Sequence, residues 1–136
     1  GLWVTVGSDH TDRKAETQGI TLAKQLCAKP VAPTLWRFDE VADHWDKLIL
    51  RSHAVKDGQR RLYQEGPTTI MLPPDDLVRR SGARPSLAAG TVMFCGTMAA
   101  KGGIKPADRF EMELEDPVLG RTIRHAYDIE PLPVAG

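Results

Sequence analysis

Hydrophobic and polar residues alternate most regularly between residues 110 and 115, where Phe, Met and Leu are separated by three glutamates. A period of two places the apolar side chains on one face of a strand and the acidic ones on the other. A proline- and glycine-bounded turn follows at 117–120, and a second β-rich run at 122–129 is its natural partner. The pattern therefore predicts a hairpin with one buried and one exposed face.

Four other strands are predicted from β-branched and aromatic runs that are bounded by turn residues. Asp57-Gly58 separates two such runs and is a strong hairpin signal. The predicted strands are 3–6, 48–55, 59–64 and a buried strand at 91–95.

The helical patterns are short. Residues 12–27 have an apolar side, but Gly19 predicts a bend or break in the middle. Residues 38–46 are predicted to form a helix capped by Asp39, and residues 73–80 one opened by proline and acids. Together with the strands, these segments predict a single β-rich α+β domain over residues 1–136.

Composition narrows the functional classes. Lys plus Arg and Asp plus Glu are 18 each, so the net charge is zero and gives no reason to expect nucleic acid or a membrane. Two cysteines are too few for a disulfide framework, which favours a cytoplasmic protein. Because a strand-like run starts directly after Gly1, we expect a processed or truncated chain, or the C-terminal part of a longer one.

Three residues carry the chemistry that the pattern suggests. Asp9 follows a predicted strand and is either a metal-ligand carboxylate or a helix N-cap or Asx-turn residue. Lys24 stands among apolar and small residues and either pairs with an acid or extends its ammonium into water. Thr97, after Gly96, could donate a hydrogen bond to a bound carboxylate or hold a loop turn.

Two further groups of residues could have either a functional or a purely structural role. Glu111, Glu113 and Glu115 could form a hard-metal site, although such a row is more commonly the solvated face of a strand. His10 adjoins Asp9, and a turn histidine satisfied by the backbone is the alternative to a functional one. The sequence contains no G-x-S-x-G motif of the α/β-hydrolases, no P-loop and no G-x-G-x-x-G motif of dinucleotide-binding proteins.

In their order, these pieces resemble the C-terminal catalytic portion of the fumarylacetoacetate hydrolase superfamily, over residues 3–129. The family has a strand that ends in an acid followed by Ser/Thr-x-Arg, then a lysine before an extended stretch ending in proline. Later come a hairpin with a following Gln, a Leu-x-Pro-Gly-Asp turn, a Gly-Thr-Pro, and a second such turn before the last hairpin. The matching segments are 5–13, 24–33, 57–64, 87–91, 96–98 and 104–129. Met98 replaces the usual proline, and the family's Glu-x-Glu pair precedes the matched region.

The resemblance implies a fold and a set of roles. The fold would be an incomplete mixed β-sandwich or roll, and the protein a homodimer. Asp9 would be one of three carboxylates on Mg²⁺ or Mn²⁺, and Lys24 would stabilise a developing enolate. The residues expected to bind substrate are Gly96, Thr97 and Arg13, with His10 as a further candidate.

The implied activity is hydrolysis of a C–C bond or decarboxylation of a 1,3-dicarbonyl or 2-oxo acid by a metal-dependent hydrolase or lyase. Upstream glutamates would complete the metal site, so the chain alone would bind metal weakly. The alternatives are a non-catalytic domain that keeps the fold and binds a ligand or partner, and a dimerisation fragment.

Overall fold

A four-stranded antiparallel sheet forms the base of the computed structural model, which describes residues 1–82, 87–131 and 133. The strand order is β4-β3-β5-β6. Its strands are β3 (Ile49–Lys56), β4 (Gln59–Pro67), β5 (Arg109–Asp116) and β6 (Arg121–Asp128). A two-residue ribbon pairs β1 (Trp3–Val4) with β2 (Trp36–Arg37).

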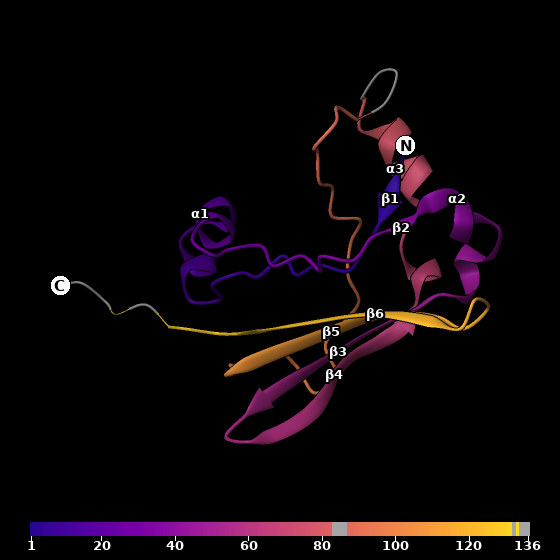
Figure 1. Ribbon diagram of the computed structural model, residues 1–136. Coiled ribbons are helices and arrows are strands. Elements are labelled where there is room, and N and C mark those ends of the chain that lie inside the picture. The colour runs from indigo at the N-terminus through magenta and orange to yellow at the C-terminus, as the bar shows by residue number, and fades with distance from the viewer. Residues whose placement is uncertain (83–86, 132, 134–136) are drawn as a thin grey trace.

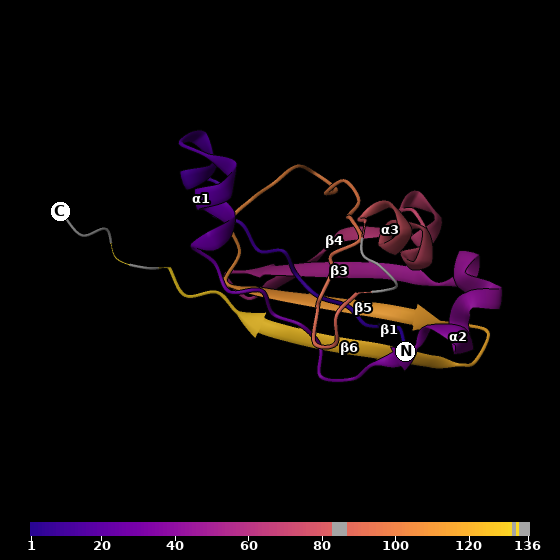
Figure 2. The ribbon, with the colours of Figure 1, turned by 90° about the horizontal axis from the view of Figure 1, so that it is seen from above.

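All helices are short, and they lie on the same side of the large sheet as the β1–β2 ribbon (Figure 1). The α-helices are α1 (Ile20–Gln25), α2 (Phe38–Val41) and α3 (Pro74–Arg80). The 3₁₀ helices are η1 (Ala15–Thr17), η2 (Ala42–Lys47) and η3 (Thr68–Ile70). Seen from above, α1 and α2 lie toward opposite ends of the sheet (Figure 2). The predicted α+β class is therefore confirmed.

In the described part of the chain, no helix has the length and hydrophobicity needed to cross a membrane.

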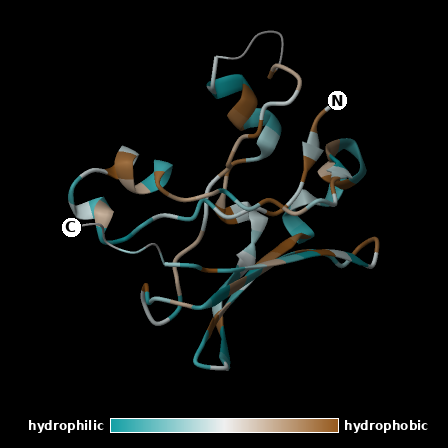
Figure 3. Ribbon diagram, turned by 60° about the vertical axis from the view of Figure 1, so that its left-hand side comes forward, coloured by the Kyte–Doolittle hydropathy of each residue, from teal (hydrophilic) through white to brown (hydrophobic). Residues whose placement is uncertain are grey.

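The two hairpins follow from the local sequence. Asp57 and Gly58 have φ angles of 51° and 77°, the left-handed pair that a tight two-residue turn requires. In β5, Met112 and Leu114 are buried while the intervening glutamates face outward. Figure 3 shows this mixture of hydrophobic and hydrophilic residues along the strands. The period-two pattern thus predicted both the strand and its buried face.

The core lies between the sheet and the segments that cross above it. Leu48 and Val41 are completely buried, and Ile123 on β6 is 2% exposed. Val4, Val6, Ala32 and Trp36 from the N-terminal segments complete the same cluster. The chain before residue 40 is therefore held to the sheet by burial of apolar surface.

One charged group is buried against this core. Asp116 is fully buried, and its Oδ1 accepts hydrogen bonds from His44 Nε2 at 2.9 Å and from the Val118 and Leu119 amides at 3.1 Å. Arg121 lies 4.4 Å above the Trp36 ring and reaches Asp116 at 3.5 Å. The β5–β6 turn is thereby tied to η2 by polar contacts.

Three predicted segments differ from the structure. Residues 91–95 form no strand, and Val92 is 68% exposed. Their composition favours a strand, but a strand also needs a paired neighbour. Residues 87–108 instead form an irregular segment that runs from the side of α3 to the large sheet (Figure 1).

The strand expected at 3–6 ends at Val4. The helix expected at 38–46 starts at Phe38 without a side-chain cap and kinks at His44, so the predicted Asp39 cap is wrong. The expected break at Gly19 is confirmed, because η1 ends before it and α1 begins after it.

Truncation of the central core residue should measure how far the fold depends on this cluster. We expect Leu48→Ala to lower the free energy of unfolding by about 2–5 kcal/mol, because a completely buried side chain leaves a cavity. Leu119→Ala is the control, since Leu119 is 52% exposed and its loss should cost within about 0.5 kcal/mol. Urea denaturation of both variants gives the comparison, and equal losses would contradict the proposed core.

Candidate functional site

Asp9 is placed by the pairing of two extended segments that are far apart in the sequence. The Ser8 amide donates to Pro30 O at 2.8 Å, and the Ala32 amide donates to Val6 O at 3.0 Å. Gly7 and Val31 form the antiparallel bridge between these bonds. Continuing this register by two residues on each side sets Asp9 opposite Lys29, as a cross-strand pair.

Both oxygens of the Asp9 carboxylate accept hydrogen bonds from lysines. Lys29 Nζ lies 2.9 Å from Oδ1. Lys24, in the last turn of α1, donates to Oδ2. The Asp9 side chain is 37% exposed, so the cluster of one carboxylate and two ammonium groups is open to water on one side.

The electrostatics of the cluster follow from this geometry. The hydrogen bonds from Lys24 and then Lys29 hold the pKa of the Asp9 carboxyl below its ordinary value, against the smaller opposing effect of burial. The carboxylate is therefore ionised, and with two ammonium groups the cluster carries one net positive charge. Such a cluster favours an anionic ligand on its open side.

The helix that carries Lys24 is itself tied to the Asp9 segment. The Asp12 amide donates to Ala23 O at 3.1 Å, and Ala23 is completely buried. Asp12 Oδ1 accepts the amides of Lys14 and Ala15 at 2.9 and 3.0 Å, which starts η1. Gly19 then breaks the helix, so that α1 can fold back toward Asp9.

Tyr127 of β6 contacts the residues on either side of Asp9. Its hydroxyl lies 2.8 Å from Ser8 Oγ and 2.9 Å from His10 Nδ1. Burial raises the pKa of Tyr127, and burial followed by the charges of Lys29 and Arg13 lowers the pKa of His10. The phenol and the imidazole are therefore neutral at pH 7.

Thr97 belongs to a different set of contacts. Its hydroxyl oxygen accepts a hydrogen bond from Gln64 Nε2 at 2.9 Å, and the same nitrogen donates to Met98 O at 2.6 Å. Gln64 Oε1 in turn accepts from Ser52 on β3 at 2.8 Å. Gly96 has a φ of 125°, a conformation that favours glycine, so this residue type suits the irregular backbone directly before Thr97.

The structure brings together some of the predicted site residues and separates others. Asp9 and Lys24 are in direct contact, whereas Thr97 is bonded to β4. Arg13 pairs with Glu16 at 2.9 Å, and His10 turns to Tyr127. The irregular segment does reach the Asp9 region through Phe94, whose ring lies within 3.2 Å of where a side chain on Gly7 would begin.

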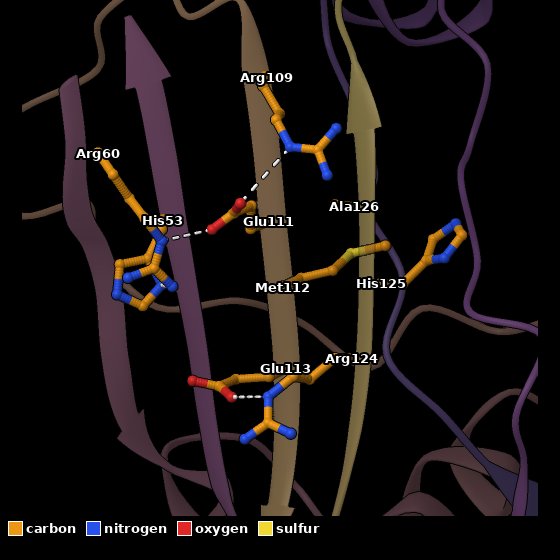
Figure 4. Close-up of a pocket in the computed structure, with 9 residues that line it drawn as sticks. All are labelled: His53, Arg60, Arg109, Glu111, Met112, Glu113, Arg124, His125 and Ala126. Atoms are coloured by element: carbon orange, nitrogen blue, oxygen red, sulfur yellow. Dashed lines mark hydrogen bonds and ion pairs between the residues drawn. The ribbon is translucent and has the colours of Figure 1, made fainter. Parts of the chain in front are cut away.

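The glutamate row of β5 lies on the opposite, open face of the sheet and is paired with basic residues. Arg60 donates to Glu111, Arg124 Nε lies 3.2 Å from Glu113, and Arg51 lies 2.6 Å from Glu115. A hollow of about 430 Å³ lies on this face (Figure 4). It is lined by His53, Arg60, Arg109, Glu111, Met112, Glu113, Arg124, His125 and Ala126. These glutamates are thus paired across strands, as expected for a solvated face.

A divalent metal does not fit the described residues by themselves. Within residues 1–82, 87–131 and 133, no three His, Cys, Asp or Glu side chains are grouped to hold an ion. Asp9 is the one carboxylate of the lysine cluster, and both of its oxygens already accept hydrogen bonds from ammonium groups. Magnesium is usually bound by one or two carboxylates together with waters and substrate phosphates, and here the single carboxylate is already occupied by two ammonium groups.

Sequence reasoning missed Lys29, Ser8 and Tyr127 as members of this site. Lys29 had a signal, since it stands directly before the Pro30-x-x-Pro33 stretch, which must be extended. Its position opposite Asp9 required the register of the Gly7–Val31 bridge, which no local pattern contains. Tyr127 required the fold, because 119 residues separate it from Ser8.

The fold and the cluster define an antiparallel α+β protein with a lysine-bound carboxylate at its surface. The chain belongs to the family described as DUF2848, protein of unknown function, whose family model matches residues 1–127. Neither the curated proteins nor the solved structures include a significant match to the chain.

The lysine contacts predict a pH-dependent stability. The pKa of Asp9 should be measured below its ordinary value of 3.8, because ion pairing favours the charged form. The stabilisation is then complete above that value and is lost as the pH falls through the lower folded-state pKa. Carbon-detected NMR titration of the Asp9 carboxyl gives the value directly.

Removal of either ammonium group should return this pKa toward 3.8, and Lys14→Ala provides the control on the same segment. An unchanged Asp9 pKa in both Lys24→Ala and Lys29→Ala would show that these ion pairs do not form in solution.

Proposed function

We propose that this chain carries part of the active site of a hydrolase or lyase that acts on a 1,3-dicarbonyl or 2-oxo acid, in the manner of the fumarylacetoacetate hydrolase superfamily. The observation that carries the proposal is the Asp9 carboxylate held between Lys24 and Lys29 on a partly exposed surface. The resemblance in the order of the sequence segments supports the same assignment.

The two lysines suit an oxo-acid substrate. Such a substrate has a carboxylate and develops a second negative charge on an enolate oxygen as its C–C bond breaks. Ammonium groups that already face a common point stabilise this charge without reorganising during the reaction. Asp9 fixes the positions of both ammonium groups before substrate binds.

The reaction balances as the addition of one water molecule. Water adds to the carbonyl carbon beside the bond that will break, and the C–C bond then cleaves. Its electron pair remains on the oxo-acid fragment as an enolate, whose oxygen is held by Lys24 and Lys29. The proton lost by the water ends on the enolate carbon, which gives a carboxylic acid and a shorter oxo acid.

A divalent ion enters this proposal only with ligands from outside the described residues. Asp9 would contribute one carboxylate, and at least one lysine would have to release it. A Glu-x-Glu pair in sequence preceding Gly1 would supply the others, as the resemblance implies. The described contacts of Thr97 lie on β4 and not at the lysine cluster, so its role at the substrate carboxylate rests on the resemblance alone.

The second candidate is a non-catalytic domain that binds a small anion. The full occupation of both Asp9 oxygens by lysines favours it, because the carboxylate is then not free to bind a metal ion, while the one net positive charge of the cluster still attracts an anion. The two functions are distinguished by the natural protein, expressed from its whole coding sequence. Turnover of acylpyruvates supports the enzyme, whereas binding of oxalate without turnover supports the second candidate.

Substitution of the lysines tests the enzyme proposal. In the natural protein we expect Lys24→Ala and Lys29→Ala each to lower kcat for an acylpyruvate by about 10²–10³-fold, because each removes one donor to the enolate oxygen. The reaction is monitored by the decrease in absorbance of the substrate's enol form. Lys14→Ala should keep full activity, and wild-type rates in both site variants would remove the lysines from the mechanism.

The metal part of the proposal has its own test. We expect isothermal titration of residues 1–136 with Mg²⁺ to show no tight, stoichiometric binding, since one lysine-paired carboxylate is a poor site for this ion. Asp9→Asn provides the comparison. Tight binding to the wild-type chain that is lost in Asp9→Asn would contradict this expectation.

A further inference from the structure

Tyr127 joins the edge strand β6 to the segment that carries Asp9. Its hydroxyl lies 2.8 Å from Ser8 Oγ and 2.9 Å from His10 Nδ1, and the three side chains are partly buried. We propose that Tyr127 is a positioning residue: its hydroxyl holds the two neighbours of Asp9 and thereby directs the Asp9 carboxylate toward its two lysine partners.

The side chains of residues 8–10 make contacts on alternating sides of the backbone. Ser8 and His10 meet Tyr127, and Asp9 between them meets Lys24 and Lys29. Such alternation is the geometry of an extended chain, in which residues i and i+2 share a side. Fixing both flanking residues fixes the peptide groups on each side of Asp9, and so the direction of its side chain.

The tyrosine ring is itself well held. Tyr127 is the cross-strand partner of Phe110, with ring centroids 5.7 Å apart, and the His10 ring meets it edge-on at the same distance. Phe110 and Tyr127 also pack against the hydrophobic core. The hydroxyl therefore projects from a side chain that the sheet has already placed.

The hydroxyl can satisfy both partners at once. A phenol has one hydrogen to donate and lone pairs to accept, so it donates to one partner and accepts from the other. Ser8 can play either part, and so can the neutral His10. Removing the hydroxyl leaves both partners without this bond in a partly buried place, where such losses are costly.

The consequence for turnover rests on the proposed function, but the positioning itself does not. The side-chain ammonium signals of the two lysines report this arrangement by NMR without any substrate. The Lys24 signal reports its bond to Asp9, whereas Lys29 also donates to the His10 carbonyl oxygen, so its signal reports Asp9 and His10 together.

The test compares two tyrosines that share a neighbour. Tyr63 also packs edge-on against Phe110, at 5.9 Å, and so Tyr63→Phe is the matched control for Tyr127→Phe. In ¹⁵N-labelled chain we expect Tyr127→Phe to weaken the ammonium signals of both lysines and to speed exchange of the Ser8 amide by about tenfold, the effect of losing one or two hydrogen bonds. Tyr63→Phe should change neither.

A second pair of variants covers the case in which Tyr127→Phe does not fold. Ser8→Ala removes one of the two bonds and should weaken the same signals, and Ser8→Thr, which keeps a hydroxyl, should restore them. Wild-type ammonium signals in folded Tyr127→Phe, or in Ser8→Ala, would overturn the positioning role. Full turnover in Lys24→Ala with the expected signal loss in Tyr127→Phe would instead contradict the proposed function alone.

Discussion

The pairing of residues 6–8 with residues 30–32 is the constraint on which the candidate site depends. It is a short antiparallel contact, with one bridge and two flanking backbone hydrogen bonds. Yet it brings Asp9 opposite Lys29, and it holds the loop between them so that α1 delivers Lys24 to the same carboxylate. Without this register, each of the three charged groups would be an ordinary surface residue.

The large sheet acts as the support for this arrangement. Its buried face carries the apolar side chains that hold the N-terminal segments, and Asp116 fixes the β5–β6 turn against η2. Tyr127 then extends the support from β6 to the residues beside Asp9. The site is thus built from irregular segments, but the positions of these segments are set by a regular element.

The sequence predicted the regular elements better than it predicted the site. The β5–β6 hairpin and the Asp57-Gly58 turn each depend on local chemistry, namely period-two alternation and a left-handed turn pair, and both are confirmed. Residues 91–95 had the composition of a strand, but pairing partners are not encoded locally, and the segment is irregular. For the same reason Asp9 and Lys24 could be suggested from residue type, whereas the contacts of Lys29 with Asp9 and of Tyr127 with Ser8 depend on the fold.

Gly7 lies at the point where these segments cross most closely. A Cβ atom there would stand 3.2 Å from the Phe94 ring and 3.3 Å from the carbonyl oxygen of Pro30. The ring could turn aside, but the carbonyl belongs to the backbone that accepts the Ser8 amide and has little freedom to move. Any side chain at Gly7 would therefore require this carbonyl to shift by a few tenths of an ångström, so a larger residue is tolerated here only if the backbone at Pro30 can yield without losing its bond to Ser8.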